Sequence, residues 1–193
     1  MTFLLEYKDL IDIIASLIVI AGILYTVSIW SRRPKLRIYF DKMKTFDEVR
    51  DGPRNILVKW VHVVAKNNGF RRAEDCNGYI LKIKKKVNES YVLLPGFKTD
   101  VYIHLHWANE PNAKGYAPQI IEGQCERRLD FFYLDKDCDI LKLFTESHLC
   151  GVPVNLEKGE YEILIAVSAK NSPTVKKWFT VRWNGSWDGI EVS

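Results

Sequence analysis

The stretch IIASLIVIAGILYTVSIW, residues 13–30, decides the architecture of this chain. It holds no charged side chain, and Arg32, Arg33 and Lys35 follow it almost at once. An α-helix of this length extends about 27 Å, close to the hydrocarbon thickness of a bilayer. The stretch also lacks the polar stripe that a surface helix of a soluble protein would show. It therefore predicts a helix that spans a membrane.

A cleaved signal peptide is the main alternative for this stretch. Such a peptide begins with basic residues and ends at a cleavage site of small residues. Residues 1–12 instead carry three acidic side chains against Lys8 alone, and the end of the apolar run is bulky. We therefore expect an uncleaved signal anchor, with residues 1–12 as a short segment outside the cytoplasm.

The charges around the span predict which side of the membrane holds the rest of the chain. Only Lys8 precedes the span, whereas six basic residues follow it closely: Arg32, Arg33, Lys35, Arg37, Lys42 and Lys44. Basic residues near a span resist translocation, so residues 31–193 are expected in the cytoplasm, held at the cell membrane by a single pass. Export of the domain is the alternative, and sequons at Asn88 and Asn184 would then matter.

Residues 36–193 form the expected soluble domain, joined to the span by a linker at 31–35. The chain is 47 % hydrophobic and 27 % charged, as a globular protein is. Residues 1–30 carry a net charge of −2, which leaves +6 for the rest of a chain whose total is +4. A basic domain beside an anionic leaflet is expected to lie close to it.

The cysteines predict no metal motif. Cys76, Cys125, Cys138 and Cys150 are far apart, and no Cys-x-x-Cys pair occurs. In the cytoplasm we expect reduced thiols, and after export two disulfides.

Runs of alternating polarity predict a mainly β domain. The clearest are Leu36–Phe40, Ile56–Lys66, Cys76–Val87 and Tyr161–Ala169. In Cys76–Val87, Tyr79 and Ile83 are expected on one face, with Ile80 and the lysines on the other. Residues 41–55 are expected in a loop, and residues 101–107 in one half-buried strand. Some eight short strands and no long amphipathic helix after the span predict an antiparallel β-sandwich.

Two segments resemble immunoglobulin-like modules of bacterial and archaeal envelope proteins. VHVVAKNNG at 61–69 is similar to their strand and Asn-Gly corner, and GEYEILIAV at 159–167 to their penultimate strand. The resemblance implies an immunoglobulin-like β-sandwich used for binding, and it transfers no site residues. The chain lacks the Cys-Trp-Cys core of antibody domains, and residues 110–155 are longer than the pattern.

Two histidines form the sharpest local feature. On a strand, His104 and His106 would leave the same face about 6.6 Å apart, with Asp100 on that face too. A metal ion can bridge this spacing if His62 or His148 supplies a third ligand. An ordinary polar strand face is the preferred interpretation, so we expect no metal and no cofactor.

A lysine ladder is the second local feature. Lys82, Lys84 and Lys86 are expected on one strand face, spaced by about 6.6 Å, near the distance between phosphates in a single strand. Other basic pairs would widen the patch if the fold gathers them: Arg71–Arg72, Arg127–Arg128 and Lys176–Lys177. Protection of a sheet edge and contact with anionic lipid are the preferred interpretations of the ladder. The alternative is contact with a polyanion, for which Lys82, Lys84, Lys86, Arg71 and Arg72 are the candidates.

Within the span, Ala15, Gly22 and Thr26 lie near one helix face and form a loose small-residue seam, which makes them candidates for self-association into a homo-oligomer. No G-x-S-x-G, glycine-rich phosphate loop or H-E-x-x-H occurs.

The sequence thus predicts a non-enzymatic, single-pass membrane protein whose β-sandwich binds a protein partner or ligand at the bilayer. Three alternatives stay open. One is a sensor-effector gated by a nucleotide or other polyanion on the basic face. The second is an adhesion or surface module outside the cell. An enzyme that uses His104 and His106 ranks last.

Overall fold

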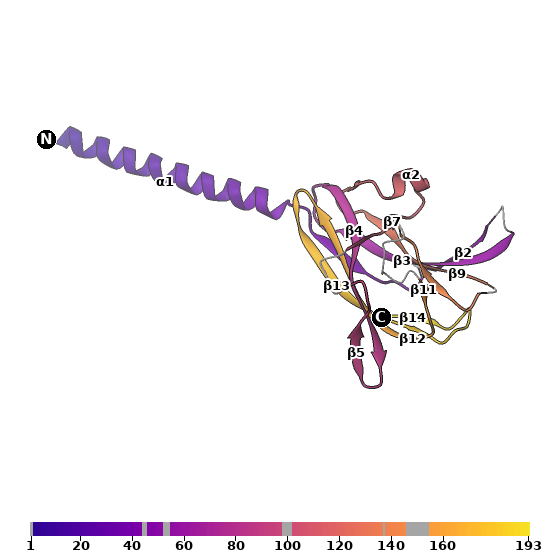
Figure 1. Ribbon diagram of the computed structural model, residues 1–193. Coiled ribbons are helices and arrows are strands. Elements are labelled where there is room, and N and C mark those ends of the chain that lie inside the picture. The colour runs from indigo at the N-terminus through magenta and orange to yellow at the C-terminus, as the bar shows by residue number, and fades with distance from the viewer. Residues whose placement is uncertain (1, 44–45, 52–54, 98–101, 137, 146–154) are drawn as a thin grey trace. The chain divides into compact units, whose positions relative to one another are not determined.

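The computed structural model describes residues 2–43, 46–51, 55–97, 102–136, 138–145 and 155–193. The chain divides into two compact units, Met1–Arg33 and Pro34–Ser193. The first unit holds one long helix, and the second holds the strands (Figure 1).

Helix α1 covers Thr2–Ser31, so it begins well before the predicted start at residue 13. Residues 2–12 hold no proline or glycine that would end a helix, and the predicted segment 1–12 is therefore helical from Thr2 onward. The stretch Ile11–Ile29 has a mean hydropathy of 2.2, and none of it is buried. By length and composition it suits a membrane anchor, and a signal sequence would share both properties.

The first sheet is antiparallel and mixes long and short strands. Its order is β1 (Leu36–Tyr39), β3 (Ile56–Asn67), β9 (Glu126–Asp135), β10 (Leu141–Leu143) and β11 (Asn155–Leu156). In addition, β2 (Phe46–Asp51) pairs with β3, and β7 (His106–Trp107) pairs with β9.

The second sheet is also antiparallel. Its order is β14 (Ile190–Val192), β13 (Ser172–Trp183), β12 (Gly159–Ala169), β4 (Ala73–Val87) and β5 (Ser90–Leu93). Two short strands, β6 (Ile103–His104) and β8 (Gln119–Ile121), pair with β4. One helical turn, α2 (Asn112–Gly115), lies between β7 and β8 in the sequence.

The two sheets share one hydrophobic core. Alternate residues of their long strands enter it, among them Val61 and Val63 of β3 and Ile163, Ile165 and Val167 of β12. Period-two alternation is what places such residues on one face of a strand. The predictions of a mainly β chain with antiparallel sheets and an N-terminal apolar helix are therefore confirmed.

The predicted loop at 41–55 is wrong for residues 46–51, which form β2. Among the described residues this strand pairs with β3 alone, from Phe46 opposite Val61 to Asp51 opposite Ile56. Its sequence FDEVRD is mostly polar because most of the strand stays exposed or half-buried. Such a one-sided strand carries little of the apolar alternation that marks a buried one.

The predicted faces of β4 are also wrong in part. Lys82 lies opposite Leu164 and Ile80 lies opposite Ile165, so Leu81 is an extra residue on β4. This β-bulge reverses the alternation, because one added residue moves all later side chains to the other face. As a result, Ile80 and Ile83 are both fully buried.

Candidate functional site

His104 and His106 do not share a strand face, contrary to the prediction. His104 of β6 lies opposite Tyr79 in the second sheet, whereas His106 of β7 lies opposite Asp130 in the first. The chain thus crosses between the sheets at Leu105. Asp100 and His148 lie outside the described residues, within which no three His, Cys, Asp or Glu side chains are placed to hold a metal.

Asp130 joins His106 to His62 instead. Its Oδ2 lies 2.7 Å from Nδ1 of His106, and its Oδ1 lies 2.8 Å from Nδ1 of His62. All three residues are buried. Burial raises the pKa of Asp130, but its contacts with the two imidazoles lower the pKa more, so the carboxyl titrates below its usual range.

Neither imidazole in this cluster offers an open nitrogen. Nε2 of His62 lies 3.2 Å from Oδ2 of Asp47, an oxygen that also accepts a 2.6 Å hydrogen bond from Arg128. Nε2 of His106 is buried against Gly115, where an added Cβ would lie 1.8 Å from it. The cluster ties β3, β7 and β9 together, and His62, His106 and Asp130 also line a cavity of about 440 Å³.

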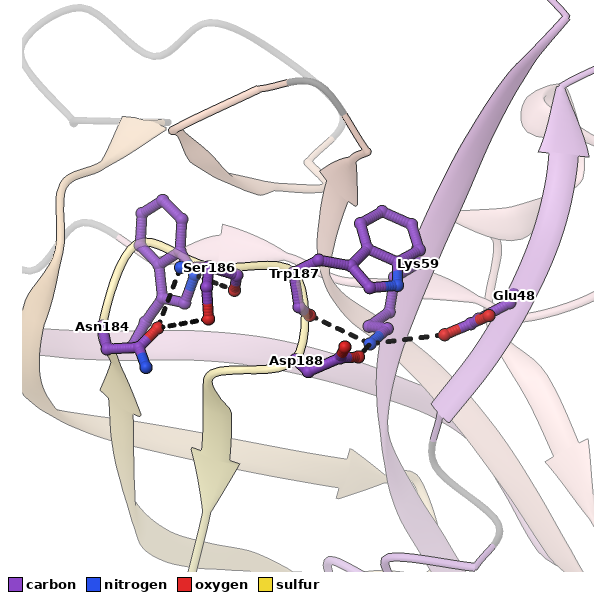
Figure 2. Close-up of polar contacts among 7 residues, drawn as sticks. Glu48, Lys59, Asn184, Ser186, Trp187 and Asp188 are labelled. Carbon is purple, nitrogen blue, oxygen red and sulfur yellow. Dashed lines mark hydrogen bonds and ion pairs between the residues drawn. The ribbon is translucent and has the colours of Figure 1, made fainter.

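Lys59 is the second buried charged group with several partners. Its Nζ lies 2.9 Å from the Trp187 carbonyl, 2.8 Å from Oδ1 of Asp188 and 3.3 Å from Oε1 of Glu48 (Figure 2). It also lies 4.7 Å from the centre of the Trp187 ring. Two of these contacts are hydrogen bonds, and the contact with Glu48 is an ion pair. Lys59 thus fastens β2 and the β13–β14 loop to β3.

The predicted lysine ladder is mostly neutralised. Glu162 of β12 lies directly opposite Lys84 of β4, and the two charges are 3.3 Å apart. Lys86 lies 3.6 Å from Glu160. Opposite charges in facing positions of a sheet stabilise the pairing of its strands. Among the three predicted lysines, only Lys82 forms no ion pair with a described residue.

The predicted arginine pairs do not extend this ladder. Arg71 and Arg72 precede β4, and Lys84 lies about 40 Å further along the strand. Three of the arginines each pair with a carboxylate: Arg72 with Glu74 at 3.0 Å, Arg127 with Glu110 at 2.9 Å and Arg128 with Asp47 at 2.6 Å.

A basic groove lies elsewhere, between β1 and β3 of the first sheet and β13 of the second. It has a volume of about 520 Å³, and its lining consists of Arg37, Ile38, Tyr39, Lys66, Asn68, Val175, Lys176 and Lys177. Half of these residues are cations, and none is an acid. In the part of the chain that the structure describes, none of the four cations forms an ion pair.

The register of the strands concentrates positive charge in this groove. Arg37 of β1 lies directly opposite Lys66 of β3. Like charges in facing positions repel, and a bound anion would relieve this repulsion. Glu126 lies opposite Lys66 on β9, but its Oε2 accepts a 2.6 Å hydrogen bond from the Tyr39 hydroxyl. Burial and this hydrogen bond raise the pKa of Tyr39 to about 12, so the hydroxyl stays protonated.

Comparisons with family models, with curated proteins and with solved structures find no match to this chain. The groove and the N-terminal helix are therefore the features from which we infer a function. The sequence had marked Lys176 and Lys177 as a basic pair beside the lysine ladder and Arg37 as a basic flank of the span, but it had not marked Lys66. These four residues come from three strands, and only the pairing of the strands brings them together.

The residues that flank the span divide between the two units. Arg32 and Arg33 are exposed. The amide of Lys35 donates a 3.0 Å hydrogen bond to Oδ1 of Asn67, and its carbonyl accepts one of 2.8 Å from Asn68. Lys35 therefore belongs to the β unit, which begins at Pro34.

The small-residue seam lies on an exposed face of α1. Ala15, Gly22 and Thr26 are all exposed, and an added Cβ at Gly22 would meet no atom within 4 Å. The Thr26 hydroxyl donates a 2.8 Å hydrogen bond to the Gly22 carbonyl of its own helix. Self-association through this seam stays a prediction.

Proposed function

We propose that this chain is a non-enzymatic, single-pass membrane protein whose β unit binds an anionic ligand in the basic groove. The observation that carries the proposal is the set of four cations around the groove that form no ion pair with a described residue. Charge-assisted contacts to phosphate or carboxylate groups are strong, and this arrangement leaves the donors for them available.

The anchor in this proposal is Ile11–Ile29 of α1. Its nineteen residues and its mean hydropathy of 2.2 match the requirement for crossing a bilayer. Arg32 and Arg33 follow it and favour a cytoplasmic β unit. The groove would then lie on the same side of the membrane as cellular nucleotides and phosphorylated metabolites.

An immunoglobulin-like sandwich is the fold that we propose for the β unit. Two antiparallel sheets around one core support it, as does the resemblance of VHVVAKNNG at 61–69 to the strand and Asn-Gly corner of such modules. Sandwiches of this type present loops and strand faces to partners, and catalysis is not required of them. The covered nitrogens of His62 and His106 favour a binding role over acid–base catalysis.

Binding of inorganic tripolyphosphate to the full chain in nanodiscs of zwitterionic lipid tests the groove. We expect Lys176→Gln/Lys177→Gln to weaken binding about tenfold, which corresponds to about 1.4 kcal/mol. The matched control is Lys84→Gln/Lys86→Gln, which removes the same charge from lysines already paired with glutamates. It should change the affinity by less than about twofold. Binding should also weaken between low and high salt, because mobile ions screen exposed charges.

Two results would contradict this assignment. One is an equal loss of affinity in the two double variants, which would mean that net charge alone attracts the anion. The other is the absence of binding at low ionic strength, where attraction to four cations is least screened.

A sensor-effector is the second candidate function. Arg37, which lines the groove, follows the last helical residue by only six positions. The groove is therefore joined to the C-terminal end of the anchor by only a few residues, and the seam of Ala15, Gly22 and Thr26 offers a face through which spans could associate.

A further inference from the structure

The turn between β3 and β4 is held firmly by its neighbours. Asn67 is fully buried, and its side-chain amide accepts a 3.0 Å hydrogen bond from the Lys35 amide and donates one of 2.7 Å to the Arg71 carbonyl. From the other side, the backbone amide of Gln124 donates a 3.1 Å hydrogen bond to the Gly69 carbonyl. The backbone of this turn is thus fixed on both sides.

Phe70 stands at the tip of the turn with 77 % of its surface exposed. Its carbonyl lies so close to Gly123 that an added Cβ there would be 2.2 Å away, so no larger residue fits at Gly123 without moving the tip. A firmly held backbone that presents a large aromatic side chain to solvent is a feature of interaction surfaces.

Basic residues surround this tip. Three exposed cations lie at this end of the β unit and form no ion pair with a side chain that the structure describes: Lys35, Arg71 and Lys170. Arg72 is paired with Glu74 at 3.0 Å, and Glu122 is exposed nearby. The tip therefore combines an aromatic ring with an excess of positive charge.

The anchor is attached at the same end of the β unit. Lys35, which bonds to the turn through Asn67, follows the last helical residue, Ser31, by four positions. A fully extended chain of that length spans about 14 Å, whatever the orientation of the two units. If α1 crosses the bilayer, covalent geometry alone keeps the attachment point of the turn close to the lipid headgroups.

We propose that Phe70 and Arg71 dock the β unit onto the anionic leaflet into which its own helix is inserted. Phe70 enters the interfacial layer, where aromatic rings are favoured, and Arg71, Lys35 and Lys170 contact lipid phosphates. This inference rests on the proposed membrane anchor. In this arrangement the Phe70 tip contacts lipid, and the basic groove binds an anionic ligand.

Hydrogen–deuterium exchange on the full chain tests this docking. The chain is placed in nanodiscs of pure phosphatidylcholine or of phosphatidylcholine with about 30 % phosphatidylglycerol. We expect residues 69–72 to exchange at least about fivefold more slowly in the anionic discs. Residues 87–90, at the opposite end of β4, provide the internal control and should exchange equally in both.

Two double variants separate docking through the Phe70 tip from general electrostatic attraction of the β unit to the anionic lipid. Phe70→Ser/Arg71→Ser should abolish the protection in anionic discs. Val87→Ser/Lys86→Ser, which makes the same kind of change at the far end of β4, should leave it intact. Equal exchange in the two lipids, protection that survives Phe70→Ser/Arg71→Ser, or protection that appears only with two copies in a disc would each overturn the proposal. The last result would identify a second copy as the occupant.

Extraction of the membranes at high pH distinguishes a failure of the docking from a failure of the membrane anchor. A chain that resists alkaline extraction but shows no lipid-dependent protection contradicts the docking alone. A chain that alkali extracts contradicts the anchor itself, and the docking falls with it.

Discussion

Replacement of Asn67 by alanine should lower the free energy of unfolding of the β unit by about 4 kcal/mol. Its side-chain amide forms four hydrogen bonds in a fully buried site, which is the full capacity of an amide. Two are accepted from the amides of Lys35 and Gly69, and two are donated to the carbonyls of Arg71 and Ile121. Each contributes about 1 kcal/mol, and a smaller side chain leaves all four backbone groups without a partner.

Urea unfolding of the full chain in detergent micelles, followed by tryptophan fluorescence, measures this effect. The matched control is Asn68→Ala, one residue further on, where the side chain forms no hydrogen bond with a described residue. It should change the free energy of unfolding by less than about 0.5 kcal/mol. Similar losses in the two variants would show that the amide of Asn67 does not organise this end of the β unit.

Replacement of Asp130 by alanine should cost about 3 kcal/mol at neutral pH, because it leaves His62 and His106 buried without their shared carboxylate. The cost should depend on pH. The folded-state pKa of Asp130 lies below its usual range, so the stabilisation is fully present above the unfolded pKa of about 3.9. It is lost as the pH falls through the folded pKa.

The same unfolding assay at pH 7, 5 and 3 tests this pH dependence. The difference between wild type and Asp130→Ala should be large at pH 7 and 5 and should shrink toward pH 3. Asp139→Ala, which removes an exposed carboxylate, serves as the control and should be nearly neutral throughout. A difference that stays constant down to pH 3 would contradict the ionised state of Asp130 in the fold.

Prediction from the sequence was most accurate where a side-chain pattern is typical of only one kind of secondary structure. The apolar run at 13–30 lies within α1, and the alternation of Tyr161–Ala169 falls within β12. It failed where two structures share one pattern. The alternation at His104 and His106 is the same for one strand as for a chain that crosses between sheets at Leu105.

The candidate site depends on strand pairing, which local sequence does not record. The lysines of β4 look like an open basic face until the register places Glu162 opposite Lys84. Conversely, nothing in the local sequence indicates that Arg37 lies beside Lys66, because only the pairing of β1 with β3 brings them together. One local signal was available: Asp130 stands within an apolar run, and a carboxylate buried in this way requires a partner such as His62.

Labelling of Cys125 with a membrane-impermeant maleimide tests the central claim most directly. Cys125 is exposed, whereas Cys76 is buried and its pKa is raised to about 11 by that burial, so its thiol reacts poorly. The variant Cys138→Ser/Cys150→Ser makes Cys125 the reporter, and Thr2→Cys in a variant that lacks Cys125 reports on the other side. The account predicts that Cys125 is labelled only after cells are permeabilised and that Thr2→Cys is labelled in intact cells. Full labelling of Cys125 in intact cells would contradict it.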